Sequence, residues 1–414
     1  MFRKEKGKVK SEKVRISALV ILTVLAPLAL LANQAEIAKW DPRMAADKAV
    51  VDTNGVKWID GRYLPIEGRW NLGDAKHYYM RLPDTLTTNV NGGVRGMRDN
   101  TSGMIFRFRT DSNFLVLRHT PLHGWHALPH MTEVGTSGWD VYRLDKKSGK
   151  WRFVASNHGA RDDAGHPGAR LKRISWTPGD ECIINLPLYN GVKEFELGIA
   201  SGSKVEAPSP WASGVTKPVV FYGTSITHGG CCTRPGLGFV NIVGRELQVP
   251  VYGLGFSGSG VMEYELSDVI SRIDASCYVL DCLWNMSMGN PDARGRTNRS
   301  VPGNYEPFIR NLRAKRPGVP IIMVEHCNVY GNTKNEKDAF IRGLYEKLKA
   351  EDPSWFERMF CGAEAKWDNL FYLPNDEMYT GDYEGTVDGC HPNDLGMMSM
   401  SKAFGKAVRE ALGL

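Results

Sequence analysis

Short apolar runs alternate with stretches of helical periodicity from about residue 216 to the end of the chain. The apolar runs lie at 218–222, 250–254, 277–283, 319–325 and 370–373. Between the first two, apolar side chains recur three and four residues apart from Phe239 to Leu247, which is the spacing of one helix face. Strands that alternate with helices form a parallel sheet, because each crossover helix returns the chain to the same edge. We therefore predict a three-layer α/β domain over residues 217–414, closed by a helix from about Asp394 to Leu412.

The pattern before about residue 202 is different, since short β-type runs occur there without long helical segments. These runs begin at Met104, Phe114, Trp139, Trp151, Cys182 and Lys193. Short strands separated by turn signals are typical of antiparallel sheets that pack face to face. We predict an antiparallel β-sandwich over residues 45–202 and a linker over 203–216, where Pro, Ser and Gly are frequent.

Ser225 follows the first strand run of the α/β part, and Asp388 and His391 lie close together near the end of the chain. A serine hydroxyl is a poor nucleophile at neutral pH, so it needs a histidine to take its proton and a carboxylate to orient that histidine. The strand leads through Gly223 into Ser225, which places the hydroxyl at the rim of the predicted sheet. Asp388 and His391 are three residues apart around Gly389, so the carboxylate can face the imidazole. Taken singly, the serine is as readily a helix cap, and the Asp-Gly-Cys-His-Pro segment an ordinary turn.

Two further strand ends supply candidate donors for an oxyanion, which acyl transfer also requires. Gly258 lies in a glycine-rich turn after the second strand run, where its backbone N–H can point into a site. Asn285 ends the third run, and its side-chain amide is the other candidate. The alternatives are a tight turn for the glycines and a loop cap for Asn285. Trp284, immediately before Asn285, is the candidate lining of a substrate pocket.

These elements each follow a strand and occur in the order Ser225, Gly258, Asn285 and Asp388–His391, and in this the chain resembles the SGNH (GDSL-like) hydrolases over residues 215–414. The resemblance implies an SGNH/flavodoxin-like catalytic domain with a Ser225 nucleophile, a His391 base and an orienting Asp388. It also implies an oxyanion hole made by the N–H groups of Ser225 and Gly258 with the Asn285 amide.

One position departs from the family pattern. The Gly-Asp-Ser-Leu block of the family reads Gly-Thr-Ser-Ile here, with Thr224 in place of the aspartate. The interaction of that aspartate is therefore missing or made by another group, while the serine itself is retained.

The segment Gly138-Trp-Asp140-Val-Tyr142 is similar to the Gly-x-Asp-Leu-Tyr element of the β domain that precedes some SGNH hydrolases in exported bacterial proteins. This resemblance implies a two-domain architecture and a periplasmic, cell-envelope or secreted setting in a bacterium. We expect the segment from His119 to Tyr142 to contact the catalytic domain at the rim of the Ser225 site, where it shapes the side that holds an acceptor sugar. The alternative is an independent module that only tethers or stabilises.

Four histidines fall within twelve residues, at His119, His123, His126 and His130. A metal site is one interpretation, but no carboxylate or cysteine accompanies them at ligand spacing. We favour loop and strand histidines that line the domain interface, and we predict no metal site and no cofactor.

The first 35 residues have the pattern of a secretory signal. Residues 1–15 carry seven Lys or Arg against two Glu, and residues 16–35 contain no charge. Small residues such as Ala32 and Ala35 are candidate cleavage points, with an uncleaved anchor as the alternative. After cleavage we expect no stable membrane span.

The remaining composition argues against several classes of partner. The net charge of +6 falls to about +1 without the +5 of the leader, so nothing favours nucleic acid binding. The eight cysteines are not spaced as a metal site, and free thiols are expected ahead of disulfides, whose pairing stays open.

Together these patterns predict an exported serine esterase that hydrolyses small acyl esters through an acyl-enzyme at Ser225. The resemblance implies O-acetyl groups on carbohydrate as the substrate. A lipase or thioesterase acting on longer acyl chains is an alternative, which the lack of an apolar lid segment outside the leader disfavours. A catalytically inactive carbohydrate-binding or surface protein is a second alternative, against which the intact set of site residues argues.

Overall fold

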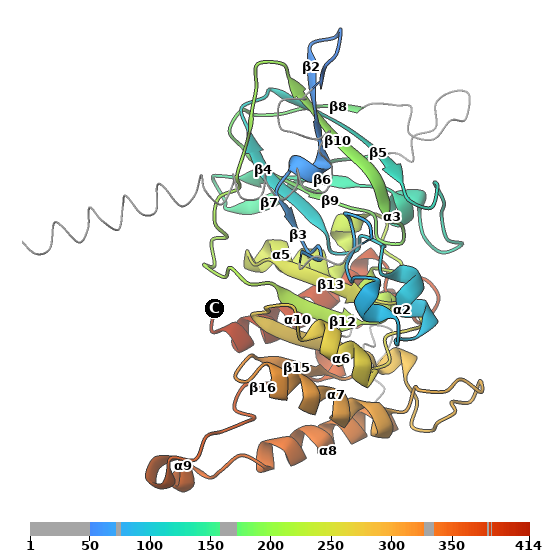
Figure 1. Cartoon of the computed structure of the whole chain (residues 1–414), viewed down its shortest axis with the longest axis vertical. Coiled ribbons are helices and arrows are strands. Elements are labelled where there is room, and N and C mark those ends of the chain that lie inside the picture. Colours follow the sequence, from blue (N-terminus) through green and yellow to red (C-terminus); the bar gives the residue numbers. More distant parts are fainter. Residues whose placement is uncertain (1–49, 72–75, 158–171, 327–334, 379–380, 382) are drawn as a thin grey trace, which may run out of the picture.

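The computed structural model describes residues 50–71, 76–157, 172–326, 335–378, 381 and 383–414 (Figure 1). The predicted leader, residues 1–35, lies outside the described residues. Within the described ranges, no helix is long and apolar enough to cross a membrane.

A five-stranded parallel sheet forms the centre of the carboxyl-terminal half. Its strands are β12 (Val219–Gly223), β13 (Val251–Gly255), β14 (Cys277–Asp281), β15 (Ile321–Val324) and β16 (Leu370–Leu373). They pair in the order β13-β12-β14-β15-β16, and each pair is parallel. The five runs predicted from the sequence match these strands to within two residues at each end. This order reverses at β12, and in such sheets a ligand site forms beyond the carboxyl ends of the strands where the order reverses.

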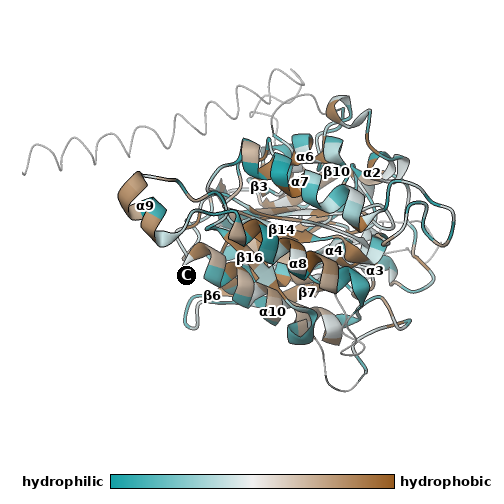
Figure 2. Cartoon of the chain, turned by 90° about the horizontal axis from the view of Figure 1, so that it is seen from below, coloured by the Kyte–Doolittle hydropathy of each residue, from teal (hydrophilic) through white to brown (hydrophobic). Residues whose placement is uncertain are grey.

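Helices cover both faces of this sheet. They are α4 (Ser225–His228), α5 (Phe239–Leu247), α6 (Tyr264–Ile270), α7 (Val301–Lys315), α8 (Glu336–Ala350) and α10 (Asp394–Leu412), while the short helix α9 (Trp355–Cys361) has no buried residue. Alternate strand residues point to opposite faces. Val219 and Phe221 therefore share a core with α5 and α10, while Val220 and Tyr222 share one with α6, α7 and α8. Figure 2 shows the hydrophobic strands enclosed between these helices, with α9 standing apart from the body.

The amino-terminal region consists mainly of antiparallel sheets. One contains β1 (Val50–Val51), β2 (Val56–Asp60), β10 (Val192–Ala200), β5 (Phe114–Pro121) and β8 (Lys172–Ser175). The other contains β11 (Val205–Glu206), β4 (Ile105–Thr110), β9 (Glu181–Asn185), β6 (Asp140–Asp145) and β7 (Lys150–Ser156), with β3 (Ile66–Glu67) beside β4. Both sheets contribute to one buried cluster, for example Leu117 of β5 and Phe108 of β4. The prediction of an antiparallel β-rich region followed by a parallel α/β domain is confirmed.

The expected linker, residues 203–216, is held against the amino-terminal sheets. Part of it forms β11, which pairs with β4. The Arg107 guanidinium donates to the Ser209 carbonyl at 2.7 Å and stacks on the Trp211 ring at 3.9 Å. The joint between the two parts of the chain is therefore packed along much of its length.

A segment of the amino-terminal region, residues 76–103, belongs to the core of the α/β part. It contains η3 (Thr85–Thr87) and α2 (Gly92–Met97), and Leu82 and Val94 pack in the same cluster as Tyr252 of β13. Gly103 lies so close to the edge strand that an added Cβ would approach the Gly253 nitrogen at 2.7 Å. This contact covers the free edge of β13, which the alternating pattern of the sequence did not reveal.

Arg81 is the polar centre of this attachment. Its side chain is fully buried and donates to the carbonyl oxygens of Gly253 at 3.2 Å, Gly255 at 2.8 Å and Met97 at 2.6 Å. Tyr252 returns a hydrogen bond to the Arg81 carbonyl at 2.6 Å. The guanidinium thus satisfies backbone acceptors on both sides of the contact.

We expect Arg81→Ala to lower the free energy of unfolding by about 3 kcal/mol or more, since several buried carbonyl groups lose their donor together. Chemical denaturation of the variant measures this loss. Arg95→Ala is the matched control, because Arg95 is exposed and donates from its side chain to the Thr88 carbonyl on the surface. Equal stability of the two variants would show that Arg81 does not hold the two parts together.

Candidate active site

Ser225 lies at the start of α4, directly after the carboxyl end of β12. The chain turns through Gly223 and Thr224, and the Thr224 hydroxyl caps the helix by accepting from the Ile226 N–H at 3.2 Å. Only glycine fits the first of these positions, because a Cβ on Gly223 would lie 2.6 Å from the Asp281 carbonyl oxygen. Ser225 keeps 7% of its surface exposed, so it is nearly buried at the carboxyl edge of the sheet.

The structure brings His391 and Asp388 to this serine in hydrogen-bonded order. Ser225 Oγ lies 2.9 Å from His391 Nε2, and His391 Nδ1 lies 2.8 Å from Asp388 Oδ2. With Nδ1–H donating to the carboxylate, Nε2 is left to accept the serine proton. This geometry can convert the hydroxyl into a nucleophile.

Backbone groups hold the Asp388 carboxylate in place. Its Oδ1 accepts from the N–H of His391 at 2.7 Å and of Cys390 at 3.0 Å. Burial alone would raise the pKa of Asp388, but the hydrogen bonds from His391 and Cys390 lower the pKa to about 2. The carboxylate is therefore ionised at neutral pH, which favours the tautomer of His391 that the site needs.

Gly258 and Asn285, the candidate oxyanion donors, lie on turns that pack against the Ser225 turn. Phe256 donates to the Gly223 carbonyl at 3.0 Å, and Gly258 follows with a φ of +66°, a left-handed conformation that favours glycine. The Asn285 Oδ1 accepts from the Gly260 N–H at 3.2 Å, which orients the amide. Among the described residues, nothing accepts from the Gly258 N–H or from the Asn285 side-chain NH₂.

Ser225 is the first residue of α4, so its N–H has no hydrogen-bond partner within the helix. The three predicted oxyanion donors thus occur at the ends of three adjacent strands, β12, β13 and β14.

The amino-terminal region supports the turn that carries Gly258. Asn91 donates from its side chain to the Ser259 carbonyl at 3.2 Å and to Glu263 at 3.0 Å. Gly93 approaches so closely that a Cβ there would meet the Ser259 hydroxyl at 1.9 Å. Sequence reasoning missed Asn91, because its partners lie in another part of the chain.

Asp281 provides a buried carboxyl group beneath the Ser225 turn. It ends β14, is 1% exposed, and accepts from the Thr227 hydroxyl at 2.8 Å. Thr227 lies two residues after Ser225, so this contact supports α4. Thr224, which replaces the aspartate of the family pattern, has no carboxylate that could do so. Burial raises the pKa of Asp281 to about 7, against the hydrogen bond from Thr227, which lowers it.

This pKa gives a prediction for stability against pH. The folded-state pKa of Asp281 is above its unfolded value of about 3.9. The bound proton therefore stabilises the folded state below about pH 4, and this contribution is lost as pH rises to about 7. Asp281→Asn mimics the protonated carboxyl, so its stability lacks this pH dependence. We expect the free energy of unfolding of the variant, relative to that of the wild type, to rise by up to about 1.4 kcal/mol per pH unit across that range. Denaturation at several pH values measures the difference.

The matched control for that series is Asp274→Asn, since the Asp274 side chain is 60% exposed. If the difference between Asp281→Asn and the wild type stays constant from pH 4 to pH 7, Asp281 does not hold its proton in the folded state.

The Gly-x-Asp-x-Tyr element joins the two parts of the chain beside the site. Asp140 is fully buried, pairs with Arg234 at 2.8 Å and accepts from the Gly236 N–H at 2.9 Å. Tyr142 accepts from Arg234 at 2.5 Å. Arg234 and Gly236 lie on the segment that continues from α4, so the expectation that this element contacts the catalytic domain is confirmed. No motif pointed to Arg234 in the sequence.

The four clustered histidines separate in the structure. His119 is buried against the Ser137 carbonyl at 2.9 Å, His123 lies 3.4 Å from Asp99, and His126 lies 3.2 Å from the Gly124 carbonyl. His130 alone among the four reaches the catalytic histidine candidate, with a ring-centroid distance of 5.5 Å to His391. Burial lowers the pKa of His119 to about 4, so that histidine is neutral.

Trp284 is partly buried in η5 (Leu283–Asn285), next to Asn285. Its ring packs at 5.6 Å between centroids against His326, which follows β15. His326 is itself held by Asp338, whose Oδ2 lies 2.5 Å from Nδ1. Trp284 therefore lies at the carboxyl edge of the sheet, where we predicted a pocket lining.

Two family models match the chain. Residues 216–409 match the GDSL-like lipase/acylhydrolase family, and residues 56–205 match the N-terminus of SGNH-hydrolase-type esterases, known as GxDLY. The chain belongs to the GDSL-like esterases of the SGNH type. A search of curated proteins gives no match to this esterase.

Solved structures agree with this assignment. The esterase is similar to a protein from Bacteroides ovatus described as a GDSL-like lipase, with 26% identity and a TM-score of 0.65 over 86% of this chain and 98% of that chain. It shares its fold with the salicylyl-acyltransferase SsfX3 of a tetracycline biosynthetic pathway, at 18% identity and a TM-score of 0.63 over 88% and 99% of the two chains. It also shares its fold with a family two carbohydrate esterase from Cellvibrio japonicus, at 13% identity and a TM-score of 0.50 over 86% and 98%.

For this esterase we expect Asn285→Ala to lower kcat by roughly 10²–10³ with little change in KM, because an oxyanion donor acts on the transition state. Steady-state kinetics on an aryl acetate measure both constants. Asn304→Ala is a control, since Asn304 donates to the Val261 and Asn298 carbonyls and lies outside the triad. A raised KM at constant kcat would mean that Asn285 binds the ground state instead.

Proposed function

We propose that this esterase removes small acyl groups, O-acetyl above all, from carbohydrate through an acyl-enzyme on Ser225. The observation that supports the proposal most directly is the hydrogen-bonded chain from Ser225 Oγ through His391 to Asp388. Together with the candidate oxyanion donors at the ends of β12, β13 and β14, this serine supplies the groups that acyl transfer requires.

The geometry supports a two-step reaction. Ser225 Oγ attacks the ester carbonyl while His391 Nε2 takes the hydroxyl proton, and Asp388 stabilises the imidazolium that forms. The oxyanion of the tetrahedral intermediate accepts from the N–H groups of Ser225 and Gly258 and from the Asn285 amide. His391 then protonates the departing alcohol, and a water molecule, deprotonated by His391, releases the acid from the serine.

Two observations support a carbohydrate as the alcohol part of the ester: the similarity to a carbohydrate esterase, and the aromatic side chains on either side of the site. The Cellvibrio japonicus neighbour with the same two-part fold is a carbohydrate esterase. His130 of the amino-terminal region lies beside His391, and Trp284 lies beside Asn285. An imidazole and an indole at the two flanks of a serine are suited to hydrogen-bond and to stack on a sugar ring.

We also propose that the esterase acts outside the cytoplasm in a bacterium. The support is the charge pattern of residues 1–35, in which a basic segment precedes an uncharged apolar one.

We expect Ser225→Ala to abolish hydrolysis of p-nitrophenyl acetate, with a loss of several powers of ten, while the melting temperature stays nearly unchanged. Ser148→Ala is the matched control, because its exposed hydroxyl donates to Asp145 on the turn between β6 and β7, away from the site. Retention of more than about a tenth of the rate by Ser225→Ala would remove this serine from the mechanism.

A series of acetate, butyrate and octanoate esters separates the proposed function from its alternatives. For a small-acyl esterase we expect kcat/KM to fall as the chain lengthens. A rise toward octanoate would identify a lipase or thioesterase, and no turnover of any ester would identify an inactive binding protein. Release of acetate from acetylated oligosaccharides then tests the carbohydrate part.

A further inference from the structure

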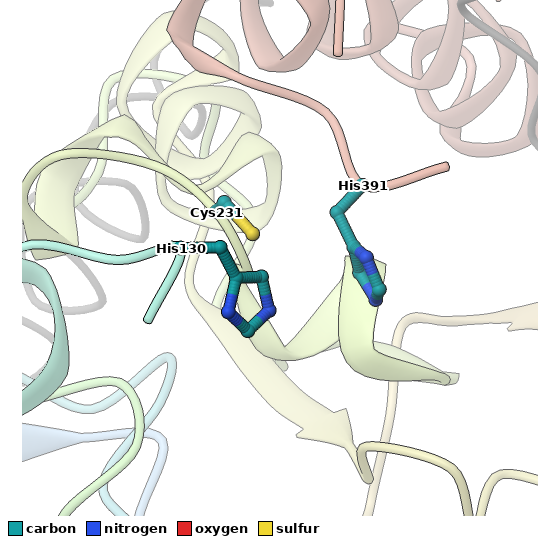
Figure 3. A group of neighbouring side chains, drawn as sticks. All are labelled: His130, Cys231 and His391. Atoms are coloured by element: carbon teal, nitrogen blue, oxygen red, sulfur yellow. The ribbon is translucent and has the colours of Figure 1, made fainter. Parts of the chain in front are cut away.

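Three potential metal ligands from three separate segments meet beside Ser225. They are His130, Cys231 and His391, each of which offers one nitrogen or sulfur atom within 4.8 Å of the other two. Figure 3 shows the His130 ring and the Cys231 thiol beside His391, on neighbouring segments of the chain. This group differs from our sequence-based prediction of no metal site, which considered His130 only with the other three clustered histidines. The periodic pattern could not show the group, because His130 comes from the amino-terminal region and the other two residues come from different loops of the α/β part.

Hydrogen bonds and packing hold the segment that follows His130 against the α/β part. The neighbouring Met131 is buried in the same cluster as Cys231. Thr132 donates from its hydroxyl to the Thr233 carbonyl, and it caps α3 (Glu133–Ser137). Gly135 of that helix lies so close to the α/β part that a Cβ would approach the Cys232 carbonyl oxygen at 2.6 Å. His130 is therefore carried by a segment that is fixed to the loop of Cys231.

Cys231 is fixed to the loop of His391 in turn. Its N–H donates to the carbonyl of Pro392, the residue after His391, at 3.0 Å, and Cys231 is 4% exposed. A cation bound here would need little rearrangement of the backbone, since both loops and the His130 segment already adjoin.

The chemistry of this group matches a borderline-soft divalent cation. Zn²⁺ prefers imidazole nitrogen and thiolate sulfur in tetrahedral sites, with a water molecule able to take the fourth position. Metal-bound histidines commonly donate their other ring nitrogen to a carboxylate, and His391 already does so to Asp388 at 2.8 Å. Since Nδ1 faces Asp388, Nε2 is the nitrogen available to a metal ion.

We propose that Zn²⁺ or a cation of the same class binds between His130, Cys231 and His391 and reversibly inhibits the esterase. The inference rests on the proposed function, in which His391 Nε2 takes the proton of Ser225. Coordination occupies that nitrogen, so the serine loses its base and its hydrogen bond. Cys231 binds as the thiolate and releases its proton to solvent, and removal of the cation by a chelator restores the thiol and the activity.

Inhibition of p-nitrophenyl acetate hydrolysis by Zn²⁺ is the first test, with each variant compared with its own metal-free rate. We expect the wild type to be inhibited and to recover in EDTA, while His130→Ala and Cys231→Ser need more than about tenfold more Zn²⁺ for the same inhibition. His123→Ala and Cys361→Ser are matched controls, because both residues are exposed and lie outside the group. Identical Zn²⁺ curves for the wild type and His130→Ala, or no inhibition of the wild type, would overturn the proposal.

Direct binding to the Ser225→Ala protein is the second test, because it does not depend on activity. Calorimetry is expected to show one Zn²⁺ per chain, and Co²⁺ is expected to give a thiolate charge-transfer band that Cys231→Ser removes. If this binding depends on His130 and Cys231 while the wild type hydrolyses no ester, the metal site stands and the proposed function fails. If the wild type is an active esterase but Ser225→Ala binds Zn²⁺ no better than Ser225→Ala/His130→Ala, the metal site is wrong and the proposed function stands.

Discussion

Parallel pairing of β12 with β13 on one side and β14 on the other is the constraint on which the candidate site depends. Parallel strands end at the same edge, so the residues that follow them meet there although they are distant in sequence. Ser225, Gly258 and Asn285 each follow one of these strands. The loop with Asp388 and His391 comes back to the same edge after β16 and ends in α10, which packs on α5 beneath the sheet.

The amino-terminal region is part of this construction and not a separate appendage. Arg81 bonds to carbonyls of β13, Asn91 holds the turn after Gly258, and Asp140 pairs with Arg234 beyond α4. Each of these contacts lies behind or beside a site element. A change deep in the amino-terminal region is therefore expected to move the oxyanion donors or the serine turn, because packed interiors transmit displacement.

The approach of His130 to His391 places one group of the amino-terminal region against the reacting centre. The same closeness supports two proposals of different kinds. As part of the site wall, His130 can recognise the alcohol part of a substrate. As a metal ligand together with Cys231, His130 can hold a cation that blocks His391. The two uses exclude each other at any moment, so occupation by metal and turnover of substrate compete for one space.

Local pattern in the sequence determined the strands and helices of the α/β part and the order of its site residues. Periodicity is a local property, and the strand runs and the helix from Asp394 to Leu412 were therefore predictable almost to the residue. The attachment of residues 76–103 to β13, the partners of Asp140 and the meeting of His130, Cys231 and His391 were not, because they depend on which surfaces of two separately patterned regions pack together. The buried position of Asp281 below α4 also required the fold, since a carboxylate that ends a strand shows its partner and its pKa only when its neighbours are in place. The sequence thus determined the secondary-structure elements and the reactive residues at the strand ends. Tertiary packing alone decided how the amino-terminal region completes the site, because contacts between distant segments leave no periodic pattern along the chain.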